Sequence, residues 1–226
     1  MRYTKFTIQN YRAIAGPLEI NIANRSLMPI IGINESGKTT ILHAIFAFDS
    51  ANDALNEDGR HLKDTINLYK TNPPPATVQA EIELSREELL VALEMLVETE
   101  DEAKSWAKGV RRKQFPDRIL ITRHIPSRDY TIDTPGLNHP TFGALLAAEI
   151  IGIAPYILFF DDFRDKIDEN IEIKSDDGVG RVSGWLAIIE RLFNRTDPQL
   201  SVFQLSGMEE RQRKSVLAKV QRPPKR

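Results

Sequence analysis

The chain has 226 residues, 41% of them hydrophobic, and its 30 basic and 32 acidic side chains give a formal charge of −2. This apolar content is enough for one large domain or two small domains with a hydrophobic core. Its near-neutral charge is unlike the strongly basic composition of many nucleic-acid-binding proteins. Because the chain has no cysteine, disulfides and thiolate metal sites are excluded, and a cytoplasmic location is expected.

The apolar segments are too short to cross a bilayer. None approaches the roughly 20 residues that a membrane-spanning helix needs, and the longest, 147–154 and 156–160, are separated by Pro155. The N-terminal residues also lack the apolar stretch of about 7–15 residues found in secretory signals. We therefore expect a soluble protein with no membrane partner.

Two segments are locally basic, residues 111–113 and residues 211–226. Either one could approach a phosphate backbone. The alternative is that they are a solvated helix face and a charged chain end, which is what charge runs usually are.

The first elements alternate between strand and turn patterns. Residues 3–9 and 18–22 have the alternation of short strands, separated by a turn at Gly16-Pro17. Residues 27–33 form a near-continuous apolar run, which predicts a central strand covered on both faces. From Gly37 the apolar residues follow helical spacing, which predicts a helix packed on the sheet.

The middle of the chain begins with a polar segment, residues 49–75, whose length is typical of a functional or mobile loop. A strand is predicted over 78–84. Ser85 and Glu88 have the spacing of a capping box at the start of a helix that continues to residue 108. The remaining predictions are a hairpin of 119–125 with 130–132, a helix over 141–151, a strand over 156–160, and helices over 182–193 and 207–220.

One motif carries specific chemistry: Gly32-Ile33-Asn34-Glu35-Ser36-Gly37-Lys38-Thr39. This motif has the pattern of a phosphate-binding loop, in which a Gly is followed by any four residues and then by Gly-Lys-Thr, between a strand and a helix. Its backbone N–H groups and the helix N-terminus attract anionic oxygens. Lys38 is predicted to contact the β- and γ-phosphates of ATP, and the Thr39 hydroxyl to ligate Mg²⁺. The candidate nucleotide contacts are Gly32, Asn34, Glu35, Ser36, Gly37, Lys38, Thr39 and Thr40.

The chain has Ile-Gln-Asn-Tyr-Arg at residues 8–12, then the strand at 18–22, and then the loop and helix at 32–42. This order resembles the RecF/SMC-like branch of ABC-type ATPases, especially OLD-like ATPases. The match is specific over residues 3–48. The resemblance implies an α/β fold, that of a P-loop NTPase with an ABC-type head whose mixed sheet is flanked by helices and carries a helical insertion. It also implies that Arg12 contacts the phosphates; a surface residue at a strand end is the alternative.

The resemblance has implications for assembly. Such ATPases hold nucleotide between two heads, so a homodimer formed through ATP is expected, together with DNA and with a nuclease domain or partner subunit. The Ser-Gly-rich signature of these heads is missing, the nearest string being Gln204 to Met208. We therefore expect a single ATPase domain over 1–226 that is the N-terminal lobe of a longer protein, or a shortened relative. Its expected parts are 1–48 (strands, loop and first helix), 49–160 (strands with a helical insertion) and 161–226 (a helical region).

Asp161 and Asp162 follow an apolar run, as the carboxylates of a Walker B strand do. In that interpretation Asp161 lies on the metal side and Asp162 orients the attacking water. The alternative is a pair of ordinary turn-forming residues, since adjacent carboxylates are common after strands.

Three functions remain open. The first is an ATPase head that controls a DNA-directed activity in DNA repair, nuclease action or antiphage defence. The second is an ATP-sensing dimerisation module that does not hydrolyse ATP. The third is a GTPase-type switch, suggested by Asp133-Thr134-Pro135-Gly136, although this string is also a natural turn.

Overall fold

The structure is a computed structural model that describes residues 1–25, 27–53, 62, 65–67, 69–157, 189, 193 and 200–221. The chain divides into two compact units, Met1–Phe159 and Phe160–Arg226. The phosphate-binding motif and the sheet belong to the first unit.

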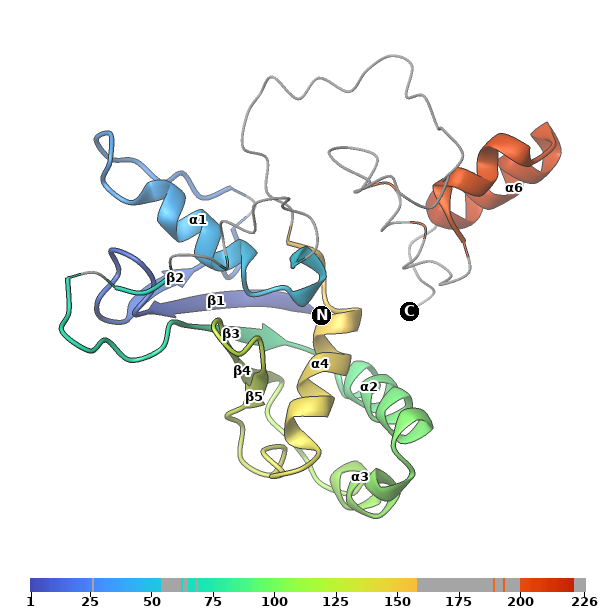
Figure 1. Cartoon of the computed structure of the whole chain (residues 1–226). Helices are drawn as coiled ribbons and strands as arrows, with labels where there is room; N and C mark the ends of the chain where they lie inside the picture. Colours follow the sequence, from blue (N-terminus) through green and yellow to red (C-terminus); the bar gives the residue numbers. More distant parts are fainter. Residues whose placement is uncertain are drawn as a thin grey trace. The chain divides into compact units, whose positions relative to one another are not determined.

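A five-stranded antiparallel sheet forms the centre of the first unit, with strand order β2-β1-β3-β4-β5 (Figure 1). Buried and exposed side chains alternate along β1 and β3, as expected for strands whose two faces differ. The strands predicted near these positions are confirmed, and so is the α/β fold class, although every described strand pair is antiparallel. The strands are β1 (Arg2–Gln9), β2 (Leu18–Asn21), β3 (Thr77–Glu83), β4 (Arg118–His124) and β5 (Tyr130–Ile132).

Helices flank this sheet. Helix α1 contacts β1, and α4 contacts β5 and α2, an arrangement that can be followed in Figure 1. No helix among the described residues is both long and apolar enough to cross a membrane. The helices of the first unit are α1 (Lys38–Phe46), α2 (Arg86–Thr99), α3 (Lys104–Arg111) and α4 (Gly143–Ile153); α6 (Glu210–Gln221) lies in the second unit.

Helix α2 begins as the sequence predicts. The Ser85 hydroxyl accepts a hydrogen bond from the backbone N–H of Glu88 at 3.3 Å, and the Glu88 carboxylate accepts one from the Ser85 N–H at 2.8 Å. The predicted continuation to residue 108 is wrong. The backbone becomes extended at Glu100, with φ −129° and ψ 91°, and a short 3-10 turn at Asp101–Ala103 separates α2 from α3.

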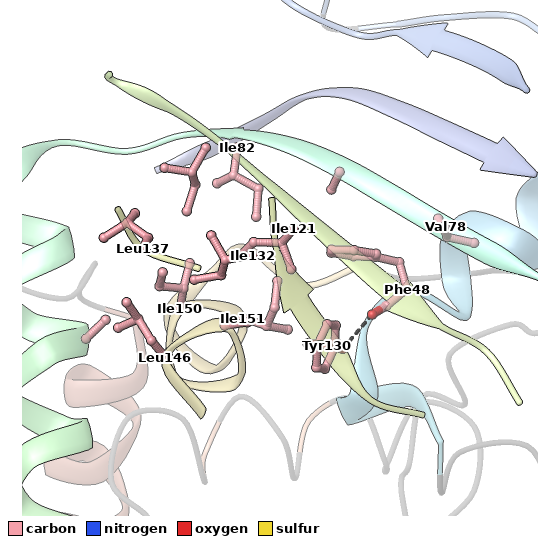
Figure 2. Close-up of a cluster of buried hydrophobic side chains, with 14 of the residues drawn as sticks. Phe48, Val78, Ile82, Ile121, Tyr130, Ile132, Leu137, Leu146, Ile150 and Ile151 are labelled. Atoms are coloured by element: carbon pink, nitrogen blue, oxygen red, sulfur yellow. Dashed lines mark hydrogen bonds between the residues drawn. The ribbon is translucent and has the colours of Figure 1, made fainter. Parts of the chain in front are cut away.

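The core of the first unit lies between the sheet and its helices. Figure 2 shows aliphatic side chains of α4 facing those of the sheet, with Phe48 and Tyr130 at one end of the cluster. The described part of the second unit has a small cluster of its own, in which Phe193, Val202 and Leu205 are buried. Burial of apolar surface on this scale is the main favourable term for folding. The residues labelled in Figure 2 are Phe48, Val78, Ile82, Ile121, Tyr130, Ile132, Leu137, Leu146, Ile150 and Ile151.

The central strand predicted over residues 27–33 is not formed. The described residues of this segment belong to no strand, and Leu27, Ile31 and Ile33 are 84%, 91% and 83% exposed. The apolar run indicates a segment suited to burial, but none of the five strands pairs with it. A continuous hydrophobic strand is stable only when neighbouring chain covers it.

Two adjacent leucines of α4 test the packing of the core. Leu146 is completely buried whereas Leu145 is 39% exposed. We expect Leu146→Ala to lower the free energy of unfolding by about 2–5 kcal/mol, because it removes apolar contacts and leaves a cavity. Leu145→Ala should cost less than about 1 kcal/mol. Urea unfolding followed by circular dichroism measures both, and equal losses would contradict the described orientation of α4.

Candidate functional site

The start of α1 has the properties of an anion site. Gly37, immediately before the helix, has φ 88° and ψ 10°, a left-handed conformation that glycine adopts without steric cost. No side chain caps this helix start and its first turn has no acidic residue. The N-terminal N–H groups and the positive end of the helix dipole therefore remain available to an anion.

The loop before the helix is tightly turned and faces solvent. A Cβ atom on Gly32 would lie 2.6 Å from the Ser36 Oγ, closer than such atoms approach in proteins. Glu35 also has a positive φ, 65°, and the Ser36 N–H donates to the Ile33 carbonyl at 3.3 Å. Successive N–H groups in such a conformation form a concave anion-binding surface. Asn34, Glu35 and Ser36 are exposed at this surface.

Lys38 extends from the first helical residue back across this loop. Its Nζ donates to the carbonyl oxygens of Gly32 at 2.8 Å and Ile33 at 2.5 Å, and lies 3.4 Å from the Ser36 Oγ. The ammonium group thus lies over the loop that would hold an anion. The three acceptors can be exchanged for phosphate oxygens, because a charged donor bonds most strongly to a charged acceptor.

The residues present fit a magnesium-bound triphosphate. Thr39 is exposed in the first turn of α1 and offers a hydroxyl beside the anion site. Mg²⁺ commonly takes only one or two protein ligands and completes its shell with phosphates and water. Among the described residues, no group of three or more His, Cys, Asp or Glu side chains could hold a metal by itself.

Arg12 lies next to Tyr11, three residues after the end of β1. Its backbone has φ 51°, its N–H donates to the Thr65 carbonyl at 2.9 Å, and its guanidinium carbon is 5.3 Å from the centre of the Tyr11 ring. Burial raises the pKa of Tyr11 to about 12, opposed by the positive charge of Arg12. The predicted contact between Arg12 and phosphate stays a prediction.

Asp161 and Asp162 lie outside the described residues, as does most of the helix predicted over 182–193. Tyr156 and Ile157, the described part of the strand predicted over 156–160, are not in a strand. At the switch-like string, the Asp133 carboxylate accepts hydrogen bonds from Thr122 at 2.6 Å and Gln79 at 2.9 Å. Asp133 therefore links three chain segments at the sheet.

The opposite end of α1 is held by a buried arginine that the sequence reasoning missed. Arg123 is 0% exposed, and its guanidinium donates to the Ala47 carbonyl and to the Asp53 carboxylate, both at 2.5 Å. A signal was present in the sequence. Arg123 follows Ile119 and Ile121 at alternate positions of β4, so it shares their buried face and needs a partner there.

Two further side chains hold the same end of α1. The Tyr130 hydroxyl donates to the Phe48 carbonyl at 2.6 Å (Figure 2) and accepts from the Ser50 N–H at 2.8 Å. The Asn52 amide donates to the Phe46 carbonyl at 3.0 Å. Burial raises the pKa of Tyr130 above its ordinary value, so the phenol keeps its proton and remains a donor at neutral pH.

Comparison with known families identifies the domain. Residues 1–124, more than half of the chain, match the model of the family described as AAA ATPase domain. The chain belongs to this family. The predicted phosphate-binding loop and α1 lie inside the matched region, so the ATPase domain implied by the sequence is confirmed.

Nine chains of solved structures also match this chain. One of them aligns over 97% of this chain and 99% of its own length, with 15% identity and a TM-score of 0.40. It comes from work on ATP-driven dimerization and DNA stimulated activation of SMC ATPases. A search of curated proteins found no match.

The contribution of Arg123 to stability can be measured by comparison with Arg118, an exposed arginine on the same strand. Arg123→Met leaves the Asp53 carboxylate and the Ala47 carbonyl without their donor, and we expect a loss of about 3–5 kcal/mol in the free energy of unfolding. Arg118→Met removes ion pairs to Glu81 and Glu83 from a side chain that is 53% exposed, and should cost about 1 kcal/mol or less. Denaturant unfolding compares the two, and a mild effect of Arg123→Met would contradict its structural role.

Proposed function

We propose that this ATPase domain binds ATP with Mg²⁺ at Gly32–Thr39 and acts as an OLD/RecF-like head that controls a DNA-directed activity. The observation that supports nucleotide binding is the position of the Lys38 ammonium group over the loop, beside an uncapped helix start. DNA repair, nuclease action and antiphage defence are the settings that the sequence resemblance implies. The cytoplasm is the expected location.

The residues of the loop have distinct roles in this proposal. Backbone N–H groups of the loop and the start of α1 hold the phosphate oxygens. Lys38 exchanges its carbonyl acceptors for the β- and γ-phosphates, and its positive charge stabilises the negative charge of the transferring phosphoryl group. The Thr39 hydroxyl ligates Mg²⁺, which neutralises phosphate charge when bound. Gly32, Asn34, Glu35, Ser36, Gly37 and Thr40 complete the phosphate site, and Arg12 contributes a further cation.

Hydrolysis needs groups beyond those that bind phosphate. We propose Asp161 as the carboxylate on the metal side and Asp162 as the group that orients water. Both lie outside the described residues, so nucleotide binding is the part of the mechanism that the described geometry supports. The alternative is therefore a non-hydrolysing ATP sensor in which the same loop controls only dimerisation. A GTPase-type switch is the weaker alternative, because the carboxylate of Asp133 already accepts hydrogen bonds from side chains of the sheet.

The proposed assembly is a homodimer of heads that closes around ATP, with DNA and a nuclease domain or partner subunit as further partners. In this proposal residues 1–226 form the N-terminal lobe of the head. The exposed apolar side chains of residues 27–33 support it, since extended apolar segments commonly pair with a strand from elsewhere.

Replacement of Lys38 tests the nucleotide site. Lys38→Ala should weaken ATP binding by about 10- to 100-fold, as expected when a charged hydrogen bond of about 1.5–3 kcal/mol is lost. Lys104→Ala is the matched control, because Lys104 is exposed and pairs with Asp101 on the surface. Isothermal titration calorimetry with MgATP measures both. Unchanged affinity of the Lys38 variant would refute the site.

Turnover measurements separate the three functions. The ATPase proposal predicts phosphate release by the wild-type chain that increases with added duplex DNA and is lost in Lys38→Ala. Binding of ATP without turnover, with or without DNA, would support the sensor instead. Stronger competition by GTP than by ATP would support the switch.

A further inference from the structure

A cavity lies on a part of the first unit that does not include the phosphate-binding loop. It has a volume of about 330 Å³ and is bounded by α2, by the end of α3 and by residues 113–117, which lead into β4. Small binding pockets in proteins commonly begin near this size. The cavity is therefore large enough to accept a side chain from a binding partner.

The floor of the cavity is aliphatic. Leu89, Leu93, Val110 and Ile119 line it, and each is at most 7% exposed. Of the described residues that line the cavity, only Phe115 is aromatic. Proteins that bind single-stranded nucleic acid stack bases on aromatic side chains. An aliphatic floor instead suits the apolar side chain of a peptide.

The rim of the cavity is cationic. Arg86, Arg111 and Lys113 line it, against one acidic residue, Asp117. Arg86 donates to the Arg111 carbonyl at 2.7 Å, which fixes the position of one guanidinium. Arg111 approaches Glu94 only to 3.7 Å, and Lys113 forms no ion pair with any residue that the structure describes. The rim thus offers positive charge beside an apolar floor.

We propose that this cavity binds a short acidic peptide segment of a partner protein. One apolar side chain of the peptide occupies the floor, and its flanking carboxylates contact Arg86, Arg111 and Lys113. Charge complementarity favours a partner of this kind over a neutral apolar one. The residues that line the cavity include none of the phosphate-binding loop.

The test uses the full chain and fluorescein-labelled peptide pools measured by fluorescence anisotropy. The main pool places two positions drawn from Leu, Ile, Val and Phe between Asp and Glu residues. One control pool replaces the apolar positions with Ser, and a second replaces the acidic positions with Lys. Labelled oligo-dT represents nucleic acid. We expect saturable binding of the main pool, at least about tenfold weaker binding of both control pools, and no competition by oligo-dT.

Charge reversal locates the binding site. Arg86→Glu with Lys113→Glu should reduce affinity for the main pool at least about tenfold, whereas Lys5→Glu with Lys104→Glu, which changes net charge equally, should change it less than about twofold. Thermal unfolding checks that each variant is folded. If the rim double variant does not fold, Lys113→Glu alone provides the test, because that side chain is exposed and its expected loss is at least about threefold.

Several results would overturn the proposal. The main pool could fail to bind, or the Ser pool could bind with equal affinity. The two double variants could lose equal affinity, or, where the single variant is used, Lys113→Glu could leave the affinity unchanged. Binding of oligo-dT that depends on Arg86 and Lys113 would instead assign the rim to nucleic acid.

Discussion

The last carbonyl of α1 and the carbonyls of the two residues after it accept hydrogen bonds from Asn52, Arg123 and Tyr130. These donors come from a following turn and from two strands of the sheet. Helix C-termini leave such carbonyls without partners, and a buried helix end needs donors from elsewhere. Helix α1 has only nine residues, too few to be stable alone. Its attachment to the sheet therefore determines where its other end, the phosphate-binding loop, lies.

The two ends of α1 are consequently opposite in character. The C-terminal end is buried and hydrogen-bonded, and Arg123 there complements the negative end of the helix dipole. The N-terminal end begins at Gly37 without a cap and faces solvent. A helix fixed at one end can leave its donors free at the other, and this makes an exposed anion site compatible with a folded domain.

Local patterns in the sequence predicted most of the fold, since alternation, helical spacing and the Ser85–Glu88 capping box depend on neighbouring residues. The phosphate-binding loop was predicted for the same reason. The exposure of Leu27, Ile31 and Ile33 could not be predicted, because burial of this apolar run depends on chain that pairs with it. Arg123 and Tyr130 were missed because their partners are 76 and 82 residues away in sequence. The alternation of buried positions along β4 was the one local indication that Arg123 is buried.

The loop and the segment before it differ in what determines their structure. The contacts of Lys38 span at most six residues, so the loop forms although residues 27–33 pair with none of the five strands. The proposed phosphate site therefore depends only on local sequence and on an anchored α1. In the proposed mechanism, closure of a head and alignment of water for hydrolysis require groups from other parts of the chain or from a second head. The proposal therefore implies that ATP affinity and ATP turnover are separable in this domain, with ATP bound before the catalytic groups are assembled.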